Sequence, residues 1–124
     1  MERLELIADT FLSVSTPVQC ALPSLLSAGR DVRQQIRART AANLRLLRSI
    51  AKPLEVEGGW YAILQVPRTR SEEEWAIALL ERHDVLVQPG FYFDFESEAF
   101  LVLSLLTPPD IFAGGVRRLM EEIG

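Results

Sequence analysis

The sequence contains a single lysine, a single cysteine and a single histidine, namely Lys52, Cys20 and His83. One cysteine cannot form an internal disulfide, and one histidine has no second histidine with which to share a metal site. No apolar run approaches the ~20 residues of a membrane span, and the charged N-terminus lacks the apolar core of a signal peptide. These absences predict a cytoplasmic protein without a membrane-spanning part, a disulfide framework or a metal centre.

The charge balance also argues against one class of partner. Acidic residues number 17 against 13 basic ones, which gives a formal net charge of -4. A general nucleic-acid-binding protein carries a basic surface, so this balance argues against that function. With 48% hydrophobic and 24% charged residues, the composition is that of an ordinary globular chain.

The stretch from Gly58 to Pro67 predicts the strand around which the chain is organised. Two glycines relax the backbone at its start, an aromatic and β-branched run follows, and a proline ends it. Because both faces of the run are largely apolar, it is typical of an inner strand covered on both sides. One face is expected to carry Trp60, Ala62, Leu64 and Val66, which makes Trp60 a buried residue.

Helical periodicity and turn signals place the other elements around this strand. Thr16 is the expected N-cap of a second helix, and the segment from Ser71 to Glu74 predicts a capping box. The predicted helices cover residues 2–12, 16–28, 31–50, 71–83 and 108–123, and further short strands cover 54–57, 85–87 and 100–106. This order predicts an α/β fold of the α+β type, in which two helices precede a short, mostly antiparallel sheet with helices packed on one face.

A nine-residue loop after Pro89 and Gly90 carries four aromatic residues, Phe91, Tyr92, Phe93 and Phe95. A loop cannot bury four rings in a core of its own. The rings therefore either line the rim of a ligand site or pack over the end of the sheet, and the sequence leaves both alternatives open.

The order of the motifs resembles a known family. The quoted features are a helix beginning at Thr16-Pro17, a strand opening with Gly58-Gly59-Trp60-Tyr61, the run Val85-Leu86-Val87-Gln88-Pro89-Gly90, a strand containing Leu103-Ser104, and a last helix with Arg117-Arg118-Leu119. This order is similar to the C-terminal part of class I/II, fold-type I pyridoxal-phosphate aminotransferases. The resemblance implies that residues 1–29 lead out of a large domain that the chain lacks, and that residues 30–124 form the small domain.

The resemblance also implies a function for the protein to which such a domain belongs. That protein would be a homodimeric transaminase that moves an amino group between an amino acid and a 2-oxo acid with pyridoxal phosphate. The family's cofactor lysine precedes the region seen here, and Lys52 does not match its position. The chain alone is therefore expected to hold no catalytic, cofactor-binding or metal-binding residue, and to be inactive without the large domain.

A second departure concerns the substrate. The family usually carries an arginine two residues before the serine of the last strand, where it binds the substrate carboxylate, and this chain has Val102 two residues before Ser104. Carboxylate binding has moved to Arg68 or Arg70, the substrate preference differs, or the activity is lost. The candidate substrate-pocket residues are Val102, Ser104, Tyr92 and Phe91.

Two other functions are compatible with the sequence. The chain is alternatively the effector-binding half of a transcription regulator with an aminotransferase-like domain, or a free-standing ligand-binding domain. The reading frame that precedes Met1 distinguishes the three, because it encodes a large domain with a lysine, a DNA-binding domain or neither.

Overall fold

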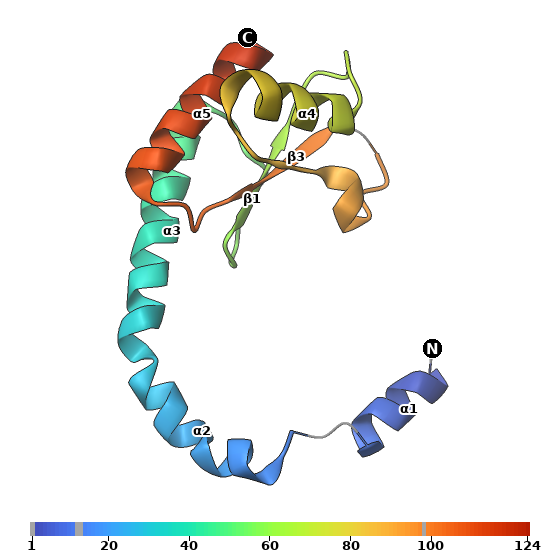
Figure 1. The fold of residues 1–124 in the computed structure, drawn as a ribbon, viewed down its shortest axis with the longest axis vertical. Helices are drawn as coiled ribbons and strands as arrows, with labels where there is room; N and C mark the ends of the chain where they lie inside the picture. The colour runs from blue at the N-terminus through green and yellow to red at the C-terminus, as the bar shows by residue number, and fades with distance from the viewer. Residues whose placement is uncertain (1, 12–13, 98) are drawn as a thin grey trace. The chain divides into compact units, whose positions relative to one another are not determined.

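The computed structural model describes residues 2–11, 14–97 and 99–124. Figure 1 shows the order of helices and strands along the chain. The helices are α1 (Glu2–Phe11), α2 (Thr16–Ala28), α3 (Arg30–Ile50), α4 (Glu72–His83), α5 (Pro109–Ile123) and the 3-10 helix η1 (Gly90–Phe93), and the strands are β1 (Tyr61–Gln65), β2 (Gln88–Pro89) and β3 (Phe100–Ser104). The chain forms two compact units, one up to Gln35 and one from Ile36 onward.

The first unit contains the two helices expected before the sheet. Helix α1 ends at Phe11, and Leu12, the last residue of the predicted helix, lies outside the described residues. The N-cap of α2 is Ser15, with no side-chain capping bond, so the predicted cap at Thr16 is wrong by one residue. Helix α2 has no buried residue. In the described part of the chain, no helix combines the length and the hydropathy that a membrane crossing requires.

The second unit is built on a three-stranded antiparallel sheet in the order β1-β3-β2. Ile63 of β1 lies opposite Val102 of β3, and Val102 lies opposite Gln88 of β2. The central strand is therefore β3, and the prediction that β1 is an inner strand is wrong. Apolar residues on both faces of β1 suggested an inner strand, but only the face of Ala62 and Leu64 is buried, and Tyr61 and Gln65 on the other face are exposed.

Trp60 differs from its prediction as well. It precedes β1 and is 46% exposed, although its carbonyl oxygen accepts a hydrogen bond from the Leu105 N–H at 2.7 Å. Alternation along a strand does not extend to a residue in the turn that enters it. The large loss of stability expected for removing a buried tryptophan, roughly 3–5 kcal/mol, does not apply to this half-exposed ring.

Two short predicted strands are absent from the described chain. Residues 54–57 contribute only one bond to β1, from the Leu54 N–H to the Ile63 carbonyl oxygen at 2.8 Å. Residues 85–87 form no strand: the Val85 N–H bonds to the Leu79 carbonyl oxygen at 3.1 Å, and pairing with β3 begins only at Gln88. Their alternating burial, with Val85 and Val87 in the core and Leu86 exposed, explains why the sequence pattern indicated a strand.

The hydrophobic core lies between the sheet and the helices of the second unit (Figure 1). Its strand residues alternate with residues of the opposite face, and its helix residues come from α3, α4 and α5. The members buried to 6% exposure or less are Leu47, Ala62, Leu64, Val66, Trp75, Leu79, Val87, Ala99, Leu101, Leu103, Leu105, Phe112, Val116 and Leu119. The predicted arrangement, a short antiparallel sheet with helices on one face after two leading helices, is confirmed.

Candidate functional site

The candidate site is the face of the sheet that turns away from the helices. Leu101 and Leu103 of β3 belong to the helix-covered core. Side chains two residues apart share a face of a strand, so Phe100, Val102 and Ser104 lie together on the other face. All four predicted site residues come from two elements that contact each other, β3, which carries Val102 and Ser104, and η1, which carries Phe91 and Tyr92.

A row of aromatic rings crosses this face. The Tyr61 and Phe93 ring centroids are 5.9 Å apart, those of Phe93 and Phe95 are 6.4 Å apart, and those of Phe95 and Phe100 are 5.3 Å apart. Tyr61 lies opposite Ser104 at one end of the β1–β3 ladder, and Phe100 lies at the other end. Val102, between these ends, is only 4% exposed.

The four aromatic residues of the loop divide into two pairs. Phe93 and Phe95 belong to the row on the sheet. Phe91 and Tyr92 are 49% and 69% exposed, and their rings meet edge to face with centroids 4.6 Å apart. One pair therefore packs on the sheet, and the other is free to meet a ligand or another protein surface. The role of Phe91 and Tyr92 in substrate binding stays a prediction.

A buried carboxylate holds the aromatic loop in place. Glu72, in the first turn of α4, is only 2% exposed. Its Oε2 accepts a hydrogen bond from the Phe91 N–H at 2.7 Å, and its Oε1 accepts one from the Phe100 N–H at 2.5 Å. The same carboxylate thus joins η1 and β3, the two elements that build the site. We expect it to act as a positioning residue, because it touches the loop backbone and not the exposed rings.

Sequence reasoning missed Glu72. The run Ser71 to Glu74 correctly predicted the capping box, in which the Ser71 side chain and Glu74 bond each other's backbone N–H groups. That explanation also accounted for the neighbouring acids as favourable charges at a helix N-terminus. One signal was available, since Gly90 immediately follows a proline before the aromatic run. A Cβ on Gly90 would lie 2.8 Å from the Glu72 Oε1 and 2.6 Å from the Phe95 ring, so the close approach requires glycine.

The two arginines considered as substitutes for the missing carboxylate ligand have different surroundings. Arg70 forms an ion pair with Glu122 at 2.6 Å, and its guanidinium lies 4.5 Å from the centre of the Trp75 ring. It is engaged in holding α4 and α5 together. Arg68 is exposed in the loop between β1 and α4. Of the two, Arg68 is the cation that a ligand can still recruit.

Glu122 is the centre of an ionic cluster at the ends of α4 and α5. Besides Arg70, it contacts Arg82 at 3.1 Å and the Nε2 of His83 at 2.9 Å, and its side chain is 9% exposed. The hydrogen bond from Arg70, followed by that from His83, lowers the pKa of Glu122 from 4.5 to about 2. His83 also lies in the last turn of α4, where a cation compensates the helix dipole, so Glu122 is an additional partner for it.

This depressed pKa predicts a pH-dependent contribution to stability. A carboxyl group with a lower pKa in the folded than in the unfolded state stabilises the fold fully above the unfolded value, and the stabilisation is lost as the pH falls toward the folded value. We expect the free energy of unfolding of Glu122→Gln to lie below that of the wild type at about pH 7. The difference should shrink as the pH falls from 4.5 to about 2.

Urea unfolding of both proteins at several pH values measures this difference. The neighbouring Glu121→Gln variant serves as the control, since Glu121 is exposed and forms no ion pair in the described part of the chain. A difference for Glu122→Gln that stays constant across the acidic range would contradict the prediction.

The residues of this chain do not fit pyridoxal phosphate as a resident cofactor. Lys52, the sole lysine, is exposed just beyond the end of α3. It does not belong to the helix-free face, whose residues come from β1, β3 and η1. No aldimine chemistry is therefore assigned to any residue of this chain.

Comparison with solved structures reveals a consistent likeness. An aminotransferase from Staphylococcus aureus matches with a TM-score of 0.67 at 20% identity, over 82% of this chain and 27% of its own. An aromatic aminotransferase from Pyrococcus horikoshii matches with a TM-score of 0.64 at 17% identity, over 78% of this chain and 26% of its own.

A third match is a protein from Escherichia coli described as having a methionine aminotransferase function. Its TM-score is 0.63 at 19% identity, over 92% of this chain and 32% of its own. No protein-family model matches the sequence, and no curated protein matches it. The chain spans between about a quarter and a third of the length of these solved structures. The predicted resemblance is thus confirmed at the level of the fold: this chain is folded like one portion of several aminotransferases.

Proposed function

We propose that this chain serves as the small domain of a pyridoxal-phosphate-dependent aminotransferase. The observation that carries the proposal is the match of most of the chain to a limited portion of several aminotransferases. The parent protein transfers an amino group between an amino acid and a 2-oxo acid. It works in the cytoplasm as a homodimer.

In this function the two domains divide the chemistry between them. The large domain supplies the lysine and the cofactor, which acts as the electron sink for the amino acid. The small domain contributes its helix-free face, where exposed Ser104, Phe91 and Tyr92 approach the substrate as the domains close. Glu72 keeps the aromatic loop fixed on the sheet during this movement, through its bonds to Phe91 and Phe100.

The experiment that tests the function begins with the complete reading frame that encodes this chain. The full-length product is purified with pyridoxal phosphate, and amino-group transfer is assayed with a panel of amino acids and 2-oxo acids. Turnover by a product with a cofactor-binding large domain supports the proposal. A DNA-binding domain in place of the large domain identifies the regulator instead, and a reading frame limited to this chain identifies a free-standing domain.

A separate prediction concerns the chain by itself. We expect no stoichiometric adduct of pyridoxal phosphate at Lys52, because an exposed lysine without neighbouring cofactor contacts reacts no better than free lysine. The 124-residue chain is incubated with equimolar cofactor, reduced with borohydride and analysed by mass spectrometry. A Lys52→Arg variant provides the blank for reaction at the N-terminal amine. Stoichiometric labelling of Lys52 would show that the chain has a cofactor site of its own.

A further inference from the structure

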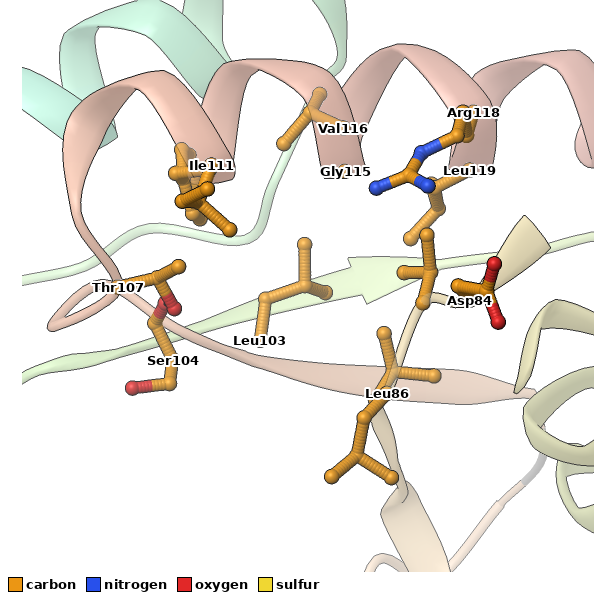
Figure 2. A pocket seen from close by; sticks show the side chains of 13 residues that line it. Asp84, Leu86, Leu103, Ser104, Thr107, Ile111, Gly115, Val116, Arg118 and Leu119 are labelled. Carbon is orange, nitrogen blue, oxygen red and sulfur yellow. The ribbon is translucent and has the colours of Figure 1, made fainter.

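A cavity of about 350 Å³ lies between α5, the end of β3 and the extended segment that precedes β2. Figure 2 shows Leu103 pointing from β3 toward α5, with Val116 and Leu119 facing it from the helix. Leu86 and Ile111 stand at the margins and are 79% and 58% exposed. Leu103, Val116 and Leu119 are themselves buried, at 6%, 2% and 0% exposure, so the apolar surface that a ligand can reach is that of Leu86, Ile111 and Gly115 at the mouth of the cavity.

Two features of the sequence create this space. The pairing of β2 with β3 is limited to Gln88↔Val102 and Pro89↔Leu101, so residues 84–87 run past the end of β3 without closing onto it. Gly115 presents no side chain from α5, and a Cβ added there would meet no atom within 4 Å. A glycine in a helix interior costs roughly 1 kcal/mol relative to alanine, so the opening comes at the expense of helix stability.

One end of the cavity carries two opposite charges. Arg118 and Asp84 both line it, and Figure 2 shows the Arg118 guanidinium reaching down from α5 toward the segment that bears Asp84. They form no ion pair in the described part of the chain. The Nε of Arg118 donates a long bond, 3.4 Å, to the Gly114 carbonyl oxygen, and within residues 14–97 and 99–124 its terminal nitrogens have no hydrogen-bond acceptor.

The opposite end of the cavity is lined by hydroxyl groups instead of charged side chains. Ser104 and Thr107 lie there in Figure 2, away from Asp84 and Arg118. The Ser104 hydroxyl oxygen accepts a bond from the Leu106 N–H at 3.3 Å, and the Thr107 hydroxyl donates to the Ser104 carbonyl oxygen at 3.4 Å. The cavity thus combines an apolar body with one charged end that offers both a cation and an anion.

We propose that this cavity binds a free α-amino acid with a branched apolar side chain. Arg118 holds the α-carboxylate, Asp84 holds the α-ammonium group, and the side chain lies between Leu86 and Ile111, over Gly115. Such a ligand pairs with both charges at once, whereas an apolar anion or an apolar amine pairs with only one of them. The proposal does not rest on the aminotransferase function, and the site is separate from the aromatic row, although Ser104 borders both.

Calorimetric titration of the 124-residue chain with L-leucine tests the proposal. For a ligand of this size we expect a dissociation constant on the order of 0.1–1 mM. Two analogues each keep only one of the two charged groups of leucine: 4-methylpentanoate lacks the ammonium group, and 3-methylbutylamine lacks the carboxylate. Each should bind at least about tenfold more weakly than leucine, since each forgoes one charge-assisted contact. No heat with leucine up to about tenfold above that range would overturn the proposal.

Adjacent glycines of α5 provide a matched pair of variants. Gly115 lines the cavity and Gly114 does not, and neither has an atom within 4 Å of an added Cβ. Gly115→Leu fills the cavity and should abolish leucine binding, while Gly114→Leu should leave it within about twofold of the wild type. Both changes favour the helix, so circular dichroism should show both variants folded. Binding that survives Gly115→Leu, or that both variants lose equally, places the ligand elsewhere.

Two further variants assign the charges. Arg118→Met should weaken leucine and 4-methylpentanoate about tenfold or more, with little effect on 3-methylbutylamine. Asp84→Asn should weaken leucine while leaving 4-methylpentanoate unchanged, and asparagine tolerates the positive φ of 51° at this position. The reverse pattern, or equal effects on all three compounds, would refute the proposed orientation of the ligand.

Discussion

Replacing Glu72 with alanine should lower the free energy of unfolding by about 2–4 kcal/mol. The carboxylate accepts the N–H groups of Phe91 and Phe100, and it is itself only 2% exposed. Its removal leaves two backbone donors without their partner where the structure packs closely, and each such donor costs about 1–3 kcal/mol. Urea or thermal unfolding of the purified chain measures the loss.

Glu73→Ala is the matched control for this prediction. Glu73 occupies the same helical turn and carries the same charge, but it is exposed and has no hydrogen-bond partner in the described part of the chain. We expect it to cost less than about 1 kcal/mol, the usual value of an acid near a helix N-terminus. Equal losses for the two variants would mean that Glu72 contributes only charge, and that its bonds to the aromatic loop add nothing.

Val102→Arg should cost about 3–5 kcal/mol, because it places an uncompensated charge at a buried position. Val102 is 4% exposed and lies in the centre of β3, with Ile63 and Gln88 as its neighbours across the sheet. In the family, an arginine at this position is expected to bind the substrate carboxylate. In this chain the same face of the sheet carries the aromatic row from Tyr61 to Phe100, and none of its residues is an acid that could pair with the new guanidinium group.

Ser104→Arg provides the comparison for this variant. Ser104 lies on the same face of the same strand, but it is exposed, so an arginine there keeps its charge in water. We expect a change of less than about 1 kcal/mol, as for other surface substitutions. A stable Val102→Arg variant would show that the aromatic row moves aside easily, and it would make that position available to a substrate carboxylate.

The sequence predicted most of the helices because their signals are local. The capping box from Ser71 to Glu74 and the glycine that ends α2 depend on residues a few positions apart. The predicted helix over residues 31–50 differs from α3, Arg30–Ile50, by one residue at its start. The fold class also followed from the order of such elements.

The positions of strands within the sheet could not be predicted in the same way. Whether a strand is central or at an edge depends on its partners, which lie about 40 residues apart for β1 and β3. The apolar run of β1 and the alternation in residues 85–87 are both compatible with several pairings. Because this information was missing, the sequence predicted neither the exposure of the Trp60 ring nor the start of β2 at Gln88.

Sequence reasoning selected candidate residues on β3 and in the aromatic loop, but it did not identify Glu72, which bonds the loop and β3 to α4. The alternation of β3 correctly placed Val102 and Ser104 on one face, and composition identified the aromatic loop. The bonds of Glu72 to Phe91 and Phe100 join residues 19 and 28 positions apart, and no local pattern reports such a contact. The substrate-binding role of Val102, Ser104, Tyr92 and Phe91 stays a prediction.

The Glu72 contacts also determine how this part of the molecule opens. The amide hydrogens of Phe91 and Phe100 are bonded to a carboxylate that belongs to the first turn of α4. They can exchange with deuterium in solvent only when that turn releases them, or when the loop and the strand end separate from it. Fraying of α4 at its N-terminus is therefore one route by which these two amides lose protection, although they lie 19 and 28 residues after Glu72 in the chain.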